Sequence, residues 1–289
     1  MLKTAVYQSY RTENVPCWIS KCMETVKDWA SLKGYDYHFI DDRMFSYAPD
    51  WYREKVKNNV LLVSDLARLE IAKELLASGY DRTIWVDADI VIFDLDNFNI
   101  DIEEEFAFTR EIWVKHTNFF GFEYIPAVCN AVTVMLKENS ILDFYIYACK
   151  KLISDPDWAK KYVYNNYKLK MKLKHRWDLW RYNIGSDFIP STLVGTTFLT
   201  NLYNQMAFHL LNNVGLFSPL MMHELTKDYS KVVAQYMKTW NTPIYSANLC
   251  GSYWNKKNDA VYMSVVERLL ESKGDIINKY HNASQVGNF

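Results

Sequence analysis

Apolar and polar residues in the N-terminal part of the chain follow an order that predicts a strand, a helix and a second strand. Residues 4–9 form a short β-prone run, and residues 35–40 alternate aromatic with polar side chains. Between them, residues 17–32 have a helical pattern that ends before Gly34, because glycine commonly follows the last helical residue. A strand, a helix and a strand in this order favour a parallel sheet and therefore an α/β fold.

A second helix is predicted to begin after Ser64, whose hydroxyl makes it a good N-cap, and to end at Gly79. The next run, residues 83–93, is almost continuously apolar and β-branched, which is typical of a central strand buried on both faces. The same patterns predict strands over 106–109 and 131–136, and helices over 141–153 and 261–273. The tail after His281 is expected to fray.

Lysine is frequent over residues 160–176, where Lys168 to Lys174 alternates strictly between lysine and apolar residues. This alternation favours a solvent-facing strand or hairpin. A charged edge strand of this kind resists aggregation, and the alternative is peripheral contact with an anionic membrane surface or acceptor. No internal repeat or low-complexity linker interrupts the sequence, so one domain over residues 1–289 is predicted.

Composition supports a folded chain with a sizeable core, because 49% of its residues are hydrophobic. Lys and Arg number 33 against 34 Asp and Glu, a balance that argues against a general nucleic-acid binder. Aromatic residues make up 16% of the chain. Core packing explains most of these rings, and exposed Trp and Tyr at a sugar-binding site are the alternative source.

The cysteines are odd in number and form no C-x-x-C pair or zinc-ligand spacing: Cys17, Cys22, Cys129, Cys149 and Cys250. They are expected to be reduced, packed thiols of a cytosolic protein. The N-terminal residues lack a secretory apolar region, and no apolar run reaches about 18 residues. We therefore expect a cytoplasmic protein without its own anchor, which would meet a membrane-bound acceptor at the inner face of the membrane.

Two aspartates interrupt the apolar run at 83–93. Asp87 and Asp89 are two positions apart, so in an extended strand both would point the same way. Two ionised carboxylates so close in a buried strand repel each other and are costly to desolvate. A divalent cation such as Mg²⁺ or Mn²⁺, which prefers oxygen ligands, would compensate them. The alternative is a strand that ends at Val86 before a polar turn, but the apolar pattern resumes at Ile90.

Asp65 and Arg68 lie three positions apart, on one face of the helix predicted upstream. They could form only a local ion pair. Placed before a metal-binding strand, they could instead contact sugar hydroxyls and phosphate oxygens.

Together these blocks resemble the retaining glycosyltransferases with the sugar-binding D-x-D motif. The order of Ser64–Arg68 and Asp87-Ala88-Asp89 is similar to that in the α-mannosyltransferase-like group and, more distantly, in the clostridial glucosylating toxins. Residues 80–89 also resemble the glycogenin and lipopolysaccharide galactosyltransferase group. Residues 195–200 are similar to a T-G-P-x-x-L-T stretch without its proline, and Gly251-Ser252-Tyr253-Trp254 resembles the toxins' S-x-W element.

The resemblance implies a GT-A-type fold, an α/β nucleotide-binding sandwich with a mainly parallel central sheet and an appended C-terminal region. The single domain would comprise a nucleotide-sugar-binding half, about residues 1–137, and an acceptor-side half with a C-terminal lid, about residues 138–289. The Asp65–Asp87 spacing is a few residues longer than in the α-mannosyltransferase-like group. The histidine that often supplies a third metal ligand is also absent from its C-terminal position.

For the donor, the resemblance implies a nucleotide sugar whose uracil or guanine base lies near the end of the first strand, around Tyr7, Gln8 and Ser9. Asp65 and Arg68 would hold the donor sugar, and Asp87 would hold its ribose or sugar. Ser252 and Trp254 would touch the β-phosphate from a mobile lid.

The metal would be Mn²⁺ or Mg²⁺, bound by Asp87 and Asp89, with Asn248 or Ser252 as a third ligand. Arg68 would stabilise the charge that builds on the departing diphosphate. Asp187 is the candidate carboxylate on the acceptor side, although it could equally cap the turn that contains it.

The predicted function is thus transfer of a sugar from a nucleotide-sugar donor to a hydroxyl of a glycan, lipid-linked glycan or protein, with retention of the anomeric configuration. A nucleotidyltransferase also uses paired carboxylates and Mg²⁺, but residues 7–14 lack the glycines of a phosphate loop. The other alternative is a nucleotide- or glycan-binding module without turnover.

Overall fold

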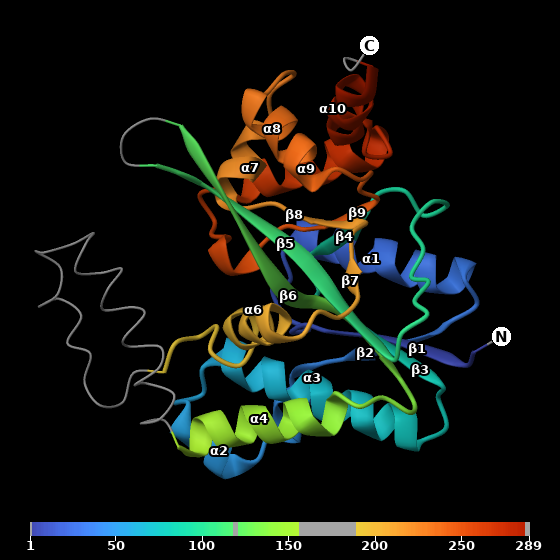
Figure 1. The fold of residues 1–289 in the computed structure, drawn as a ribbon, viewed down its shortest axis with the longest axis vertical. Coiled ribbons are helices and arrows are strands. Elements are labelled where there is room, and N and C mark those ends of the chain that lie inside the picture. The colour runs from blue at the N-terminus through green and yellow to red at the C-terminus, as the bar shows by residue number, and fades with distance from the viewer. Residues whose placement is uncertain (1, 118–120, 156–188, 287–289) are drawn as a thin grey trace, which may run out of the picture.

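The computed structural model describes residues 2–117, 121–155 and 189–286, and its central element is a six-stranded sheet (Figure 1). The strand order is β2-β1-β3-β6-β5-β7. β1 (Thr4–Ser9) lies between β2 (Asp36–Ile40) and β3 (Arg82–Val86) and is parallel to both.

Beyond β3 the sheet is mixed. β6 (Phe122–Leu136) is antiparallel to β3 and to β5 (Phe106–His116), and the short β7 (Leu210–Leu211) is parallel to β5. All strands of this sheet except β6 therefore run in the same direction. This is the mixed α/β fold with a mainly parallel sheet that the sequence predicted.

A second, three-stranded sheet has the order β4-β9-β8. β4 (Ile90–Ile92) is antiparallel to β9 (Ser246–Asn248), which is parallel to β8 (Val214–Leu216). The chain enters this sheet directly after β3. One short turn, residues 87–89, therefore joins the two sheets.

Helices cover both sides of this arrangement (Figure 1). The first core cluster joins the sheet to one group: η1 (Asp42–Tyr47), α2 (Asp50–Lys55), α3 (Val60–Ala77), α4 (Leu142–Ser154) and α6 (Thr196–Gln205). A second cluster joins the small sheet to α1 (Cys17–Leu32), α7 (Pro219–Glu224), α8 (Lys231–Trp240), α9 (Asp259–Glu271) and α10 (Asp275–Val286). Buried residues of β1, β3, β6 and α1 form a third cluster.

The predicted start of the helix at Ser64 is wrong. α3 begins five residues earlier, at Val60, and its N-cap is Asn59, whose side-chain oxygen accepts hydrogen bonds from the backbone N–H groups of Leu61 and Leu62. Ser64 lies inside the helix, and its hydroxyl donates to the carbonyl of Val60 at 2.7 Å. Two residues of types favoured at N-caps, Asn59 and Ser64, lie five positions apart, and the earlier one is used.

The predicted continuous strand over residues 83–93 is also wrong. β3 ends at Val86, and the apolar pattern resumes at Ile90 because a strand of the second sheet begins there. Asp87 and Asp89 therefore lie in the turn between two sheets, as the alternative interpretation held.

Other boundaries differ less. β5 and β6 are longer than predicted, and α10 continues past His281 to Val286, where fraying was expected. The lysine-rich residues 160–176 lie outside the described ranges. All five cysteines are free, as expected, and four of them are buried. Within the described ranges, no helix combines the length and apolarity needed to cross a membrane.

Candidate functional site

An open cavity of about 1050 Å³ lies where β1 and β3 end, the position at which open α/β sheets commonly bind ligands. Its described lining comes from several parts of the chain: the segment after β1, η1, α3, the turn 87–89, β5, β6, the start of α6 and the loop after β9. Its volume is at the upper end of the range for small-molecule sites, about 300–1,000 Å³.

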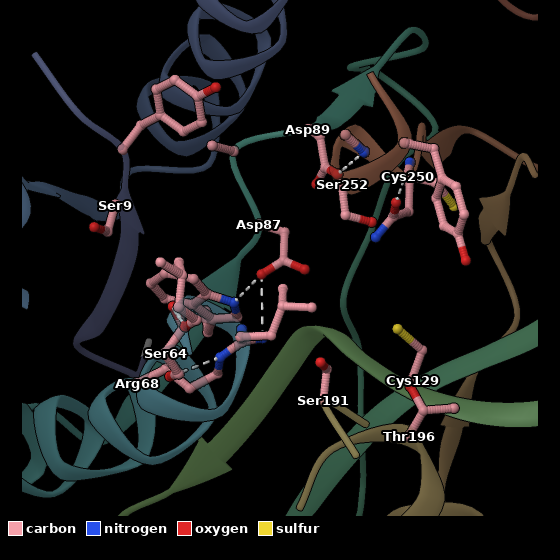
Figure 2. Close-up of a pocket in the computed structure, with 18 of the residues that line it drawn as sticks. Ser9, Ser64, Arg68, Asp87, Asp89, Cys129, Ser191, Thr196, Cys250 and Ser252 are labelled. Carbon is pink, nitrogen blue, oxygen red and sulfur yellow. Dashed lines mark hydrogen bonds and ion pairs between the residues drawn. The ribbon is translucent and has the colours of Figure 1, made fainter. Parts of the chain in front are cut away.

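The turn Asp87-Ala88-Asp89 forms part of the cavity lining. Backbone hydrogen bonds fix the turn, because Asp87 N–H donates to the carbonyl of Ala131 at 2.8 Å and Ile90 N–H donates to the carbonyl of Asp87 at 3.1 Å. Figure 2 shows Asp87 between Arg68 on one side and Asp89 with the Cys250–Ser252 segment on the other.

Arg68 lies between two carboxylates. Its Nη1 donates to Oδ1 of Asp87 at 3.1 Å, and its Nη2 lies 3.4 Å from Oδ1 of Asp65. The guanidinium also donates to the carbonyl of Asn130 at 2.9 Å and stands over the ring of Trp85. The ion pair that the sequence left open between Asp65 and Arg68 is thus present, within a larger network.

Asp65 and Asn130 complete this network beneath the cavity. Asn130 Nδ2 donates to Oδ1 of Asp65 at 2.8 Å, and both residues are buried. Gly195 packs so tightly against Asp65 that a Cβ there would lie 2.7 Å from its Oδ2. Burial raises the pKa of Asp65 to about 6, and the neighbouring Arg68 opposes that rise.

Asp89 is held from the C-terminal side of the chain. Its Oδ2 accepts the backbone N–H of Gly251 at 2.6 Å. Burial, followed by the charge of Asp87, raises the pKa of Asp89 to about 7. Burial also raises the pKa of Asp87. The two adjacent carboxylates therefore resist being ionised at the same time. A bound cation would stabilise both of them in the charged form.

The oxygen atoms around this turn suit a hard divalent cation. Oδ2 of Asp87 has no hydrogen-bond donor among the residues that the structure describes. Asn248, at the end of β9, lines the same cavity, and its Oδ1 accepts the N–H of Cys250 at 2.7 Å. No group of three or more His, Cys, Asp or Glu side chains with metal-binding geometry occurs in the described ranges, so an amide, water or substrate oxygen would complete the ligands.

The predicted base-binding residues at the end of β1 divide into two groups. Ser9 lines the cavity, whereas Tyr7 and Gln8 are buried beneath it. The Tyr7 hydroxyl donates to the carbonyl of Arg68 at 2.7 Å, and Gln8 Nε2 donates to the carbonyl of Asp87 at 3.2 Å. In the structure these two side chains support the site from below.

The residues predicted to form a C-terminal lid also fall into two groups, one lining the cavity and one not. Ser252 lines the cavity, but Trp254 does not, because its Nε1 donates to Asp259 at 2.8 Å and the ring packs against the second core cluster. Tyr253 lines the cavity instead. Asp187 lies outside the described residues.

Several residues at the cavity were not predicted from the sequence, and four of them matter most for its chemistry: Asn130, Glu111, Trp113 and Tyr253. Glu111 and Trp113 are on β5 beyond the predicted strand end, and both line the cavity. The alternation of Thr109, Glu111 and Trp113 with Ile112 and Val114 is the signal that could have extended the strand and placed them on one face.

Comparisons with known proteins give little more than a coarse likeness. The sequence matches no protein-family model. No curated protein matches it either. Among solved structures, it is similar to a glycosyltransferase involved in the glycosylation of the major capsid of PBCV-1, with a TM-score of 0.44 and 10% sequence identity over 90% of this chain and 99% of that chain. Any function proposed for this chain therefore rests on the chemistry of the site.

Proposed function

We propose that this chain is a metal-dependent glycosyltransferase of the GT-A type, which moves a sugar from a UDP- or GDP-linked donor to a hydroxyl acceptor with retention. The observation that carries this proposal is the pair Asp87 and Asp89, which line a large open cavity at the ends of the parallel strands. The resemblance of the blocks around Asp65, Arg68 and the D-x-D motif supports the same chemistry.

The charge of the cavity is the physical reason for including a metal. Among its described lining residues the acidic side chains are Asp42, Asp87, Asp89 and Glu111, whereas the basic ones are Arg11 and Arg68. Arg68 is already paired with Asp65 and Asp87. A diphosphate would be repelled from such a surface unless a cation accompanied it.

The cation expected is Mn²⁺ or Mg²⁺, held by Asp87 and Asp89, with the amide oxygen of Asn248 as a further candidate ligand. Bound there, it would stabilise the negative charge that develops on the diphosphate as the anomeric C–O bond breaks. Arg68 would keep Asp87 ionised and correctly placed, since its guanidinium contacts that carboxylate directly.

Other residues of the site would hold the donor. Ser9 and the apolar side chains of Met44 and Leu61 line the part of the cavity proposed for the nucleoside. Ser252 would donate its hydroxyl to a phosphate oxygen. The acceptor oxygen then forms a bond to the anomeric carbon while the bond to the diphosphate breaks, and the hydroxyl proton passes to the departing diphosphate oxygen.

The test is release of UDP or GDP from a panel of nucleotide sugars by the full chain, with Mn²⁺ and with chelator. We expect at least one donor to be hydrolysed with Mn²⁺ only, and Asp89→Asn to lower that rate roughly 100-fold or more. Asp96→Asn is the matched control, because Asp96 is exposed and its one ion-pair partner among the described residues is Lys273. Absence of both hydrolysis and Mn²⁺-dependent nucleotide binding across the panel would overturn the proposal.

A further inference from the structure

One wall of the cavity has no role in donor or metal binding as proposed above. It comprises Glu111 and Trp113 of β5, with Tyr253 of η2 (Gly251–Tyr253) beside them. We refer to these three residues as the β5 wall. Figure 2 shows Ser9 and Cys129 on opposite sides of Asp87. Because Cys129 is a neighbour of Glu111, the β5 wall lies on the side of the cavity away from the proposed nucleoside position.

Glu111 is an unusual residue for this position. It is only 8% exposed, and no Lys or Arg in the described part of the chain forms an ion pair with it. The adjacent Arg110 is committed elsewhere, since its guanidinium donates to the carbonyls of Thr239 and Trp240. The neighbouring Cys129 thiol opposes the effect of burial on the pKa of Glu111, and Glu111 lines the cavity, where a ligand can reach it.

Burial raises the pKa of Glu111 to about 7. A carboxyl group kept in such surroundings is unfavourable for folding and needs a hydrogen-bond partner. A ligand hydroxyl entering the cavity would supply that partner.

Trp113 and Tyr253 supply apolar surface next to this carboxyl. Their ring centroids are 5.4 Å apart with an interplanar angle of 44°, so they form a bent aromatic surface. Tyr253 is 53% exposed and lines the cavity, so its ring is accessible to a ligand there. An exposed aromatic surface beside a polar group such as the Glu111 carboxyl suits a ligand that has one apolar face and several hydroxyls.

We propose that the β5 wall is the acceptor subsite and that it binds a saccharide. The C–H face of the sugar ring packs on Trp113 and Tyr253, and a hydroxyl next to the attacking one donates a hydrogen bond to Glu111. This inference rests on the proposed glycosyl transfer for the reaction, but binding of a saccharide to the wall does not require turnover. Glu111 thereby orients the acceptor sugar, while the proton of the attacking hydroxyl passes to the departing diphosphate oxygen.

Binding is tested first, by saturation-transfer NMR with a panel of methyl α- and β-glycosides of glucose, galactose and mannose, in the presence of diamagnetic Mg²⁺ and UDP or GDP. We expect saturation of at least one glycoside by the wild-type chain and its loss in Trp113→Ala and Tyr253→Ala. Tyr253 is exposed, so its variant is expected to fold even if the Trp113 variant does not. Tyr147→Ala, on α4, is the matched control, since Tyr147 is 62% exposed outside the cavity lining.

The reaction is tested second, with the same glycosides as acceptors. The ratio of transfer to donor hydrolysis should fall roughly tenfold or more in Glu111→Gln and Tyr253→Ala. It should stay constant in Tyr147→Ala and in Glu103→Gln, a change at an exposed glutamate before β5. A purely structural role would lower both rates and leave the ratio unchanged, which would overturn the proposal.

The two proposals fail separately. If no glycoside binds the wild-type chain, or if binding survives in both aromatic variants, the acceptor subsite is wrong even when donors are hydrolysed. If glycosides bind through the β5 wall but no nucleotide sugar is hydrolysed or bound, the subsite stands as a saccharide-binding site and the transferase proposal fails.

Discussion

The backbone N–H of Gly251 donates a 2.6 Å hydrogen bond to Oδ2 of Asp89, although 162 positions separate the two residues. The Leu249 N–H donates to the carbonyl of the same aspartate at 3.0 Å. β4 and β9 pair directly beside this contact, with Ile90 opposite Asn248. The loop after β9 and the turn after β3 therefore form one structural unit, and the position of Asp89 depends on both.

Replacement of Gly251 by alanine tests this dependence. A Cβ at this position would lie 3.0 Å from Oδ2 of Asp89 and 3.2 Å from the ring of Trp18, so the loop or the carboxylate has to move. We expect Gly251→Ala to lower Mn²⁺-dependent donor hydrolysis roughly tenfold. Lys256→Ala, an exposed change just beyond the same loop, should have no effect. Equal rates for wild type and Gly251→Ala would mean that Asp89 does not need this contact.

Arg68→Met tests the buried charge network. The change leaves Asp65 and Asp87 without their common cation, and breaking a buried ion pair in this way costs about 3–5 kcal/mol. Urea unfolding at neutral pH should show this loss. The loss should shrink at about pH 4, where protonation of Asp65 removes part of the uncompensated charge.

Arg43→Met is the control for that experiment. Arg43 forms a comparable ion pair with Asp41, but its side chain is 79% exposed, and such pairs contribute about 0–1 kcal/mol. Similar losses in both arginine variants would contradict a special role for the Arg68 network.

Glu111→Gln should change how stability depends on pH. The folded chain holds the Glu111 proton up to about pH 7, whereas the ordinary pKa is 4.5. Between these values the folded state binds more protons than the unfolded state, so the free energy of unfolding falls as pH rises. The glutamine variant avoids this loss, and we expect it to be roughly 1–3 kcal/mol more stable than wild type at about pH 8, with no gain at about pH 4.

Thermal unfolding across this pH range measures the difference, with Glu103→Gln as an exposed control. A stabilisation that is the same at both ends of the range would show that ionisation of Glu111 is not its source.

Asn59→Ala and Ser64→Ala compare the observed and the predicted N-cap of α3. Asn59 accepts from Leu61 and Leu62, and its Nδ2 also donates to Ser191 at 3.0 Å. Its removal should cost about 1 kcal/mol or slightly more in chemical denaturation. Ser64→Ala should cost less than about 0.5 kcal/mol, because its hydroxyl bonds only to the carbonyl one turn earlier. The reverse order would restore Ser64 as the cap.

Local patterns predicted the first strand, helix and strand well, because each has a period that its own residues display. The run at 83–93 misled for a physical reason. A strand that ends at Val86 and a strand of another sheet that begins at Ile90 both bury their residues, so apolarity alone does not show the boundary. The partner that defines β4, Ser246–Asn248, is far away in sequence.

The candidate site shows the same limit. Asp65, Arg68, Asp87 and Asp89 were predicted because each lies in a short block with a recognisable pattern, and the structure brings them together. The alternation along β5 could have placed Glu111 on a strand, but its proximity to Cys129 and its place in the cavity follow from the long β5–β6 hairpin, which that local pattern does not predict.

Binding of Mn²⁺ to the full chain in the presence of UDP or GDP tests the central claim most directly. Titration followed by electron paramagnetic resonance of free Mn²⁺ should show one nucleotide-dependent site in the wild type. We expect its affinity to fall roughly tenfold or more in Asp87→Asn and Asp89→Asn, and to be unchanged in Asp96→Asn. Nucleotide-dependent Mn²⁺ binding of equal strength in all four proteins, or none in the wild type, would contradict a metal site at Asp87 and Asp89.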